Sequence, residues 1–518
     1  MDIGWLAGQS GALLRSVDPG WPALSLEDGV TWTYEELHTR ANACTNGLIK
    51  HGVSPGDRVA ILMYNSLDYW ALYLGATQLG AIAVRLNFRL TREELRYALM
   101  DSQPSVVCAD SELLIRIEGV RQDLIVAHYF CHGERTPELS TWCRSWDELW
   151  GHTGVWTPQR QVSLDVAAML MYTSGTTGRP KGAVWTHGNT LWFAAMQAIR
   201  WQLTSDRVVL TTGPMYHVGA MEDLAIAVLA VGGHVVVTRS QGFDIDHTLR
   251  LIQERKVTDA VLFPFMIYQM IDARTVHDYD LSSLSRILSG GDPLLPYAVE
   301  WIQEQLPGVE LVQVYGLTEG TPIASASSTR QGSPIASVGR PLPFTEISIR
   351  NDAGAPVDVD VEGEIWIRSP VVCHDYWGKP VESAETFVDG WCKTGDLGYY
   401  DADGVLFVSG RKKDMVRSGG ENIYPAELES VLLSHPQVRD VAIVGVPDQR
   451  YLEAVCAVVV PDPGSRPTVT GIVDYARERL APYKVPKYVI FVEELPRTPS
   501  GKVMKYELRD RYRDIERS

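Results

Sequence analysis

Cysteine is scarce in this sequence and is not arranged in pairs. Seven cysteines are spread over 518 residues, and no Cys-x-x-Cys occurs. An odd number of widely spaced cysteines in a large chain argues against a disulfide framework and against a cysteine-ligated zinc site. We therefore expect a protein of the reducing cytosol, with a cytoplasmic location.

Long apolar runs and a basic leader are also missing. The longest apolar stretch, 224–237, is interrupted by Gly232, Gly233 and His234 and is too short to span a bilayer. The first residues, Met-Asp-Ile-Gly-Trp-Leu, lack the basic segment that opens a signal peptide. The sequence thus predicts neither a membrane span nor a secretory signal.

Positive charge is in deficit. The chain carries 47 lysines and arginines against 64 aspartates and glutamates, a formal net charge of −17. This balance argues against nucleic acid or an anionic membrane as the main partner. An acidic protein that binds a polyphosphate has to gather cations locally, so a loop bearing Lys or Arg, or a metal ion, is the feature to look for.

What is present is an ordinary globular composition in a chain long enough for at least two domains. Short apolar runs, such as 58–63, 81–84 and 106–109, alternate with helical patterns such as 66–79 and 296–305. Strands that alternate with helices predict an α/β fold whose mainly parallel sheets are covered on both faces.

The pattern changes twice towards the C-terminus. From about 341 to 408 the strands are short and turn signals recur, which predicts antiparallel hairpins and a small β-barrel-like subdomain. After that come a helix near Pro425, strands at 441–446 and 454–460 and a helix at 470–480, enough for a small α+β domain. We predict an N-terminal domain over 1–410, a hinge at 411–413 and a C-terminal domain over 414–518.

The most informative stretch is 172–182, Tyr-Thr-Ser-Gly-Thr-Thr-Gly-Arg-Pro-Lys-Gly, which follows the strand-like run 166–171. Glycines let backbone amides converge, and hydroxyls and cations beside them complete an anion site suited to a polyphosphate. The stretch is not a Walker loop, because Gly178 is followed by Arg179. A polar surface turn is the plain alternative.

Four further stretches accompany it: Tyr-Gly-Leu-Thr-Glu at 315–319, Gly-Trp-Cys-Lys-Thr-Gly-Asp-Leu-Gly at 390–398, a glycine- and charge-rich run at 410–429, and Pro-Arg-Thr-Pro-Ser-Gly-Lys at 496–502. In this order and spacing the sequence resembles the adenylate-forming superfamily, which includes acyl-CoA synthetases, peptide-synthetase adenylation domains and beetle luciferases. The resemblance extends from about residue 32 to residue 505. It implies a C-terminal lid that rotates about a hinge at Lys413.

The resemblance also implies an activity. ATP would activate a carboxylic acid as an acyl-adenylate with release of pyrophosphate, Mg²⁺ would assist, and the thiol of coenzyme A would accept the acyl group. One departure leaves the acceptor open: where many acyl-CoA synthetases have Trp-Gly-Glu, this chain has Tyr-Leu-Glu at 451–453. The alternative is an amide ligase in which an amine attacks the adenylate. The oligomeric state is undetermined, and a homodimer stays among the options.

The nucleotide-binding residues that the resemblance implies fall into three groups. Phosphates would meet Thr173, Ser174, Gly175, Thr176, Thr177, Gly178 and Lys181. Adenine would lie beside Gly290, Gly291, Asp292, Tyr315 and Gly316. The ribose would bind Asp396 and Arg411. From the residues alone, Asp396 capping a turn and 289–292 forming a tight loop stay open.

The reacting groups are assigned in the same way. Glu319 would bind Mg²⁺, Thr318 would contact the α-phosphate, and Lys502 would bridge the carboxylate and the α-phosphate. The plain alternatives are a helix N-cap for the Thr-Glu pair and a solvated lysine in a Gly/Ser/Pro loop.

The acid and its acceptor have their own predicted residues. The acyl pocket would consist of Tyr216, His217, Val218, Phe263, Phe265, Met266, Gly316 and Gly320, which suits a mostly apolar acid. His217 would be either a gate beside the carboxylate or a structural histidine. The acceptor tunnel would contain Arg417, Gly419 and Gly420.

Overall fold

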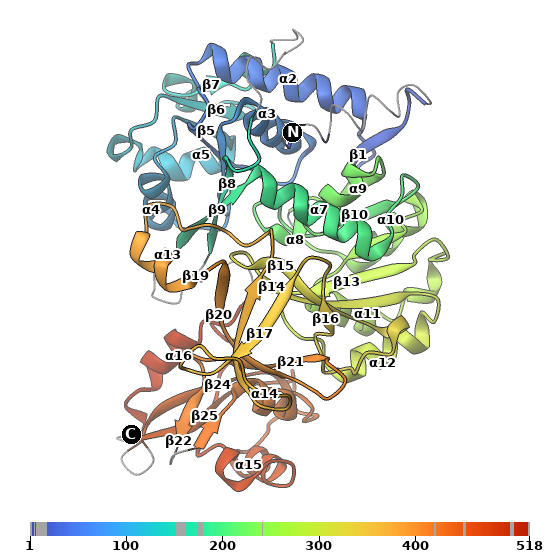
Figure 1. Ribbon diagram of the computed structural model, residues 1–518, viewed down its shortest axis with the longest axis vertical. Helices are drawn as coiled ribbons and strands as arrows, with labels where there is room; N and C mark the ends of the chain where they lie inside the picture. Colours follow the sequence, from blue (N-terminus) through green and yellow to red (C-terminus); the bar gives the residue numbers. More distant parts are fainter. Residues whose placement is uncertain are drawn as a thin grey trace. The chain divides into compact units, whose positions relative to one another are not determined.

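The computed structural model describes residues 3–4, 6, 18–151, 162–173, 180–240, 242–418, 421–448, 452–497 and 502–515. The chain divides into two compact units, and Figure 1 colours the chain by sequence position, so that their residues can be located in it. Unit 1 comprises Met1–Ile347 and Trp366–Lys393, and unit 2 comprises Ser348–Ile365 and Thr394–Ser518. Within the described residues, no helix has the length and apolar character needed to cross a bilayer.

Unit 1 contains a seven-stranded sheet with the order β7-β6-β5-β3-β4-β8-β9. All neighbours are parallel except β8 and β9, which are antiparallel. The strands are β3 (Arg58–Leu62), β4 (Ile82–Arg85), β5 (Val106–Asp110), β6 (His128–His132), β7 (Arg144–Ser145), β8 (Ala167–Thr173) and β9 (Lys181–Thr186).

A nine-stranded sheet in the same unit has the order β16-β15-β14-β13-β12-β10-β11-β1-β2. Its six central strands are parallel, and antiparallel strands flank them at both sides. The strands are β1 (Pro22–Leu26), β2 (Thr31–Thr33), β10 (Val208–Thr211), β11 (His234–Val237), β12 (Asp259–Val261), β13 (Arg286–Gly290), β14 (Glu310–Leu317), β15 (Thr321–Ser328) and β16 (Arg340–Pro341).

The helices of unit 1 follow the local sequence signals. Helix α3 starts after Ser66, whose hydroxyl accepts the Tyr69 N–H at 3.1 Å, and stops at Gly80 in the left-handed region. The helices are α2 (Tyr34–Lys50), α3 (Leu67–Leu79), α4 (Arg92–Ser102), α5 (Ser111–Glu118), α6 (Asp147–Trp150), α7 (His187–Trp201), α8 (Val218–Met221), α9 (Ala225–Ala230), α10 (Ile245–Arg255), α11 (Pro264–Ala273), α12 (Pro296–Gln305) and α13 (Pro380–Thr386).

Both sheets of unit 1 are covered on both faces. Successive residues of a strand point in opposite directions, so each strand contributes side chains to two cores. In β3, Val59 and Ile61 join a core shared with α3, α7, α9 and the nine-stranded sheet. Ala60 and Leu62 join a second core with α4 and α5. A third core packs the other face of the nine-stranded sheet against α10, α11 and α12. Figure 1 shows α4 and α5 at one side of the unit and α10 to α12 at the other.

Three strands run from one unit into the other: β17 (Glu346–Arg350), β18 (Gly363–Arg368) and β20 (Trp391–Tyr400). Strand β19 (Phe387–Val388) and strand β21 (Leu406–Arg411) both pair antiparallel with β20. The turns close where the sequence predicts them, since Gly354 N–H donates to Asn351 O and Gly404 N–H to Asp401 O, both at 2.9 Å. The antiparallel hairpins expected in this part of the chain are confirmed.

The rest of unit 2 is a small α+β arrangement. Strand β24 alternates between two cores, with Val441 and Ile443 facing α14 and α15, and Ala442 and Val444 facing α16. The elements are β22 (Val416–Ser418), β23 (Glu421–Ile423), α14 (Pro425–Leu433), β24 (Val438–Asp448), β25 (Leu452–Pro461), α15 (Val469–Arg477), β26 (Tyr488–Phe491) and α16 (Lys505–Tyr512). The sheet order is β23-β22-β25-β24, with β26 on β25.

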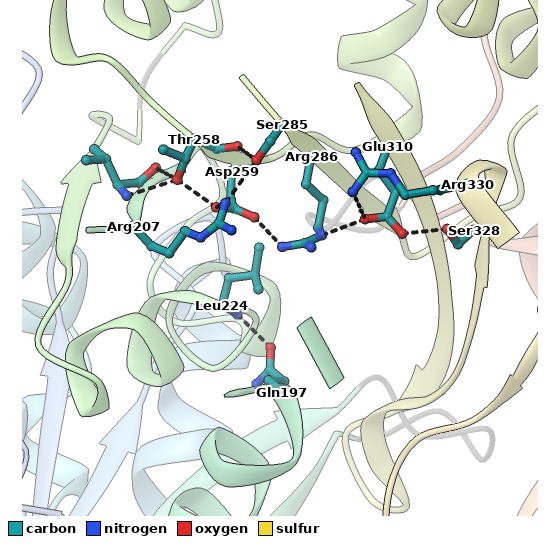
Figure 2. A network of polar contacts seen from close by, with 11 residues as sticks. Gln197, Arg207, Leu224, Thr258, Asp259, Ser285, Arg286, Glu310, Ser328 and Arg330 are labelled. Atoms are coloured by element: carbon teal, nitrogen blue, oxygen red, sulfur yellow. Dashed lines mark hydrogen bonds and ion pairs between the residues drawn. The ribbon is translucent and has the colours of Figure 1, made fainter. Parts of the chain in front are cut away.

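A row of alternating charges crosses the amino edge of the nine-stranded sheet (Figure 2). Asp259, Arg286 and Glu310 are the first residues of β12, β13 and β14 and are register partners. Arg286 Nη1 lies 2.5 Å from Asp259 Oδ1, and its Nε lies 3.3 Å from Glu310 Oε2. Arg207 and Arg330 extend the row at 3.6 and 3.8 Å. Pairing allows three buried charges to share this edge.

Removing the central cation should destabilise unit 1. Arg286→Met would leave the fully buried Asp259 and the 8% exposed Glu310 without their shared partner. The expected loss is about 3–5 kcal/mol of unfolding free energy, the usual cost of breaking a buried pair. Arg330→Met is the control, because Arg330 is 60% exposed and should contribute less than about 1 kcal/mol. Equal urea midpoints for the two variants would contradict this reading.

Candidate nucleotide site

The two ends of the glycine-rich stretch lie side by side at one edge of the seven-stranded sheet. Strand β8 ends at Thr173, β9 begins at Lys181, and these two residues are antiparallel register partners. The predicted phosphate contacts between them, Ser174, Gly175, Thr176, Thr177 and Gly178, lie outside the described residues. The residues that precede and follow the undescribed part of the stretch therefore lie next to each other on β8 and β9.

Glu319 reaches the first of these flanks. It lies in the turn between β14 and β15, where Gly320 N–H donates to Leu317 O at 3.2 Å. The Thr173 hydroxyl donates to Glu319 Oε1 at 2.8 Å. The helix N-cap considered for Thr318 and Glu319 is absent, because a strand turn stands there. A Cβ at Gly316 would overlap the carbonyl oxygens of the facing strand, so a glycine is needed for this close pairing.

Thr318 is fixed through its backbone. Its carbonyl oxygen accepts the indole N–H of Trp185 at 3.0 Å and the Cys373 thiol at 3.5 Å. The Cys373 N–H donates to the carbonyl oxygen of Glu319 at 2.9 Å. Strand β9 and the segment after β18 thus hold the turn from both sides, leaving the Glu319 carboxylate to be oriented by hydroxyl groups.

Tyr376 connects Glu319 with Lys181. The Tyr376 hydroxyl donates to Glu319 Oε1 at 3.1 Å, and Lys181 Nζ lies 5.0 Å from the centre of the Tyr376 ring. Burial raises the pKa of Tyr376, and the negative charge of Glu319 raises it further, so the phenol stays protonated as a donor. One aromatic side chain therefore contacts a carboxylate with its hydroxyl and an ammonium with its face.

Helix α4 holds both flanks of the glycine-rich stretch. The Tyr172 hydroxyl donates to Asp101 Oδ2 at 2.9 Å, and the Tyr97 hydroxyl donates to the carbonyl oxygen of Pro180 at 3.1 Å. Asp101 Oδ1 lies 2.5 Å from Lys379 Nζ. The hydrogen bond to Asp101 raises the pKa of Lys379, so this lysine remains a cation. Asp101 thereby couples β8 to the segment that carries Tyr376.

The predicted adenine wall lies at the carboxyl edge of the nine-stranded sheet. Gly290 ends β13, and a Cβ there would lie 2.5 Å from Val314 Cγ2 on β14. Gly291 has a φ of +94°, which favours glycine. Asp292 is exposed. Tyr315 and Gly316 belong to β14, the strand paired with β13, so these candidates lie on neighbouring strands.

The predicted acyl-pocket residues separate into exposed and buried ones. Phe263 caps α11, and its ring would be 3.0–3.1 Å from a Cβ at Gly213 or Gly219. Phe265 is 51% exposed. Met266 is buried, and its sulfur accepts the Thr212 hydroxyl. Val218 is buried at the start of α8, and Gly320 packs against Leu317.

His217 and Tyr216 occupy the loop after β10. His217 Nδ1 accepts the Gly219 N–H at 3.1 Å, so in the neutral ring the proton lies on Nε2. The Tyr216 hydroxyl accepts from Arg89 Nη1 at 2.9 Å. Arg89 also lines a cavity of about 490 Å³, whose walls are Tyr64, Phe88, Arg89, Arg116, Ser240 and Gly242.

Two buried side chains, absent from the predicted set, hold this loop. Arg85 donates to the carbonyl oxygens of Met215 at 2.9 Å and His217 at 3.2 Å. Its charge is balanced by Glu222, 2.5 Å away, with both side chains fully buried. Asn65 accepts the Met215 N–H and donates to the carbonyl oxygen of Gly213, both at 2.8 Å. The loop is therefore fixed from the neighbouring sheet.

Unit 2 contains the other predicted residues, described within that unit. Asp396 and Arg411 are register partners on β20 and β21, and Arg411 Nε lies 3.2 Å from Asp396 Oδ1. Lys413 follows in a turn, and burial lowers its pKa. Arg417 lies on β22, and its N–H donates to Glu453 Oε2 at 2.7 Å. Gly419 and Gly420 lie outside the described residues.

Lys502 lies next to an isolated antiparallel bridge in unit 2. The backbone of Arg497 forms an antiparallel bridge with Val503, and Met504 N–H donates to the carbonyl oxygen of Pro496 at 2.8 Å. Lys502 itself is partly buried. The lysine therefore directly precedes Val503, which is fixed by this bridge.

Comparison with known proteins decides the family. Residues 15–377 match the family described as AMP-binding enzyme, and residues 427–502 match the AMP-binding enzyme C-terminal domain. The chain belongs to the AMP-binding enzyme family. It is an adenylate-forming ligase, and the superfamily and the α/β fold predicted from its motifs are confirmed.

Relatives of this AMP-binding enzyme match it over almost its full length. A feruloyl-CoA synthase of Amycolatopsis sp is 39% identical over 489 residues, 93% of this chain and 94% of that protein. The solved anthranilate CoA ligase AuaEII, in complex with anthranoyl-AMP, has a TM-score of 0.89 at 27% identity, covering 100% and 98% of the two chains. The amide bond synthetase McbA from Marinactinospora thermotolerans has a TM-score of 0.86 at 28% identity, covering 99% and 100%.

In this AMP-binding enzyme the structure brings Thr173, Lys181 and Glu319 together and adds Tyr376 and Asp101, which sequence reasoning missed. Tyr376 stands in Asp-Tyr-Trp-Gly-Lys-Pro at 375–380, just before α13. An aromatic pair ahead of Gly-Lys-Pro is a weak turn signal, and it says nothing of partners 57 and 195 residues away.

Weakening the contact between α4 and β8 should weaken nucleotide binding. Asp101→Asn removes the charge opposite Lys379, and we expect ATP affinity to fall on the order of ten-fold, because Tyr172 on one flank of the stretch and Lys379 both lose a charge-assisted contact. Asp123→Asn is the matched control. Its partner Arg96 lies on α4, as Asp101 does, but the side chains of Asp123 and Arg96 are both more than one-third exposed. Titration calorimetry measures both. Unchanged affinity in Asp101→Asn would refute the bracing role.

Proposed function

We propose that this enzyme uses ATP to convert an apolar aromatic carboxylic acid into an acyl-adenylate and then transfers the acyl group to the thiol of coenzyme A. The observation that carries the proposal is the meeting of Thr173, Lys181 and Glu319 around Tyr376 at one edge of unit 1. A cation, a hydroxyl and a carboxylate next to a glycine-rich stretch suit a polyphosphate and its metal ion.

The first half-reaction needs charge stabilisation more than covalent chemistry. A carboxylate oxygen attacks the α-phosphorus, the bond to the bridging oxygen breaks, and pyrophosphate leaves with the bonding electrons. In the proposed arrangement Lys181 and the hydroxyls of 174–177 contact the leaving phosphates, and Thr318 contacts the α-phosphate. Such positioned donors act where negative charge accumulates in the transition state.

Mg²⁺ fits the proposed site through Glu319. Both hydroxyl contacts of the carboxylate are made by Oε1, and a carboxylate has about four acceptor positions, so Oε2 is oriented and can bind a cation. Among the described residues no group of three or more acidic, histidine or cysteine side chains forms a closed metal cage. A single carboxylate suits Mg²⁺, which takes phosphate oxygens and water as its other ligands. When bound, the ion would neutralise phosphate charge.

The remaining nucleotide contacts are proposed from residues of both units. Asp396 would accept hydrogen bonds from the ribose hydroxyls, and Arg411 lies beside it, with Arg411 Nε 3.2 Å from Asp396 Oδ1. Tyr315 would stack on the adenine beside Gly290 and Gly291. Lys502 would bridge the acid and the α-phosphate. Lys413 would be the hinge that lets unit 2 turn between the two half-reactions.

The choice of acid is supported by relatives and by local chemistry. Feruloyl-CoA synthase and anthranilate CoA ligase are named for aromatic acids. In this chain the ring of Phe263 packs over Gly213 and Gly219, next to the loop of His217. His217 would be the polar group beside the carboxylate, and its Nδ1 accepts the Gly219 N–H at 3.1 Å. An aromatic wall with one polar donor is typical of such pockets.

An amide ligase is the second candidate. The amide bond synthetase McbA matches the fold at a TM-score of 0.86. In this chain Tyr-Leu-Glu replaces Trp-Gly-Glu at 451–453, and Glu453 accepts the Arg417 N–H beside the proposed acceptor tunnel. An amine acceptor would then replace the thiol after the same adenylation.

The test is ATP–pyrophosphate exchange over a panel of acids: hydroxycinnamic, aminobenzoic, indolic, fatty and dicarboxylic. We expect exchange that depends on an aromatic acid and Mg²⁺, followed by acyl-CoA formation when coenzyme A is added. Amide formation with amines or amino acids, and none with coenzyme A, would select the second candidate. ATP hydrolysis to ADP, or no acid-dependent exchange with any acid, would contradict the proposal.

Lys502→Ala should separate binding from chemistry. Loss of the bridging cation is expected to lower acid-dependent exchange on the order of 100-fold, the scale of removing one transition-state donor, while MgATP binding survives. Lys484→Ala serves as the control in the same unit, because Lys484 pairs with Glu427 near the surface. Exchange at the wild-type rate in Lys502→Ala would remove Lys502 from the mechanism.

A further inference from the structure

We infer that Tyr376 is a positioning residue that keeps the Lys181 ammonium and the Glu319 carboxylate apart and separately oriented, so that one meets phosphate and the other meets the metal ion. The inference rests on the proposed function, and it concerns a residue outside the motifs that led to that function. It follows from two contacts made by different parts of one side chain.

The first contact uses the hydroxyl. Tyr376 Oη donates to Glu319 Oε1 at 3.1 Å, on the same oxygen that accepts the Thr173 hydroxyl at 2.8 Å. Two donors on one oxygen fix the rotation of the carboxylate, so the direction of Oε2 is set by protein groups before any cation arrives.

The second contact uses the ring face. Lys181 Nζ lies 5.0 Å from the Tyr376 ring centre, within the range of a cation–π interaction. Among the described residues, the Lys181 ammonium contacts the ring face of Tyr376, and the Glu319 carboxylate accepts two hydroxyl hydrogen bonds in place of an ion pair with Lys181. A direct pair would neutralise both charges and would have to break before phosphate and metal could bind. The aromatic ring instead contacts the ammonium with its face.

Tyr376 is itself rigidly held. Its N–H donates to the Ser383 hydroxyl at 2.9 Å, its backbone forms an antiparallel bridge with Ala183 on β9, and the next residue, Trp377, donates to the carbonyl oxygen of Gly182 at 2.8 Å. Its side chain also packs on Phe387, with ring centres 5.4 Å apart. The segment is therefore bound to the strand that begins with Lys181, which suits a spacer between two charges.

The test separates the metal-dependent part of ATP affinity from the rest. Tyr376→Phe keeps the ring and removes the hydroxyl. Its ATP affinity, measured by titration calorimetry, is expected to fall about ten-fold in excess Mg²⁺ and to stay within about two-fold in EDTA, since only the charge-assisted contact to Glu319 is lost. Tyr376→Leu removes the ring as well and should also lose affinity in EDTA.

Two further variants complete the design. Tyr279→Phe removes a phenol–carboxylate contact of the same kind, 3.3 Å from the hydroxyl to Asp246. It should leave ATP affinity unchanged both in excess Mg²⁺ and in EDTA. Ser383→Ala frees the Tyr376 backbone and should weaken Mg²⁺-dependent affinity in the same direction but by less. It remains informative if Tyr376→Phe folds poorly, which thermal unfolding would show.

Equal loss of affinity in Mg²⁺ and EDTA for Tyr376→Phe, or no loss in either, would overturn the inference. So would wild-type affinity that Mg²⁺ does not improve. The proposed function is judged separately by the acid panel on the wild-type protein. If no acid supports exchange but Tyr376→Phe still loses only the Mg²⁺-dependent part, the positioning role stands and the proposed reaction fails.

Discussion

The structure of the candidate site depends on one carboxylate oxygen. Glu319 Oε1 accepts hydrogen bonds from Thr173 at the end of β8 and from Tyr376 in the segment before α13, while Glu319 itself lies in the turn after β14. The two sheets of unit 1 and a late segment of the chain thus meet at a single acceptor. A change in any of these three segments would move the carboxylate, and with it the geometry on which a bound cation would depend.

Charged side chains have different partners at the two edges of the nine-stranded sheet. At the amino edge, Arg286 pairs in register with both Asp259 and Glu310, and Arg207 and Arg330 extend the row, so each charge there has a partner within the protein. At the carboxyl edge, the turn after β14 carries Glu319, which is held by neutral hydroxyl groups. Ligands of open α/β sheets bind at the carboxyl ends of strands, and this division of charge is consistent with that rule.

Local sequence patterns predict the helices and strands, but they do not predict the contacts between them. The pattern at 296–305 predicts α12 with its observed bounds, because burial of one helix face imposes that spacing locally, and the apolar run at 166–171 predicts most of β8 by its length. Asp101 and Tyr376 could not be predicted as site residues, since their roles come from partners such as Lys379 and Glu319 that lie far away in sequence. Arg85 could not be predicted for the same reason. It is a charged residue inside an apolar strand, and its partner Glu222 is 137 residues away in the sequence.

The most direct measurement is hydrogen–deuterium exchange of the wild-type protein with and without saturating MgATP. The account predicts slower exchange in peptides covering 172–182 and 316–321 of unit 1 and 394–411 of unit 2, with no change at the amino edge around 258–260 and 285–287, because bound ligand suppresses local opening where it makes contacts. MgATP binding that leaves 172–182 and 316–321 unprotected would contradict the central claim that these segments hold the nucleotide.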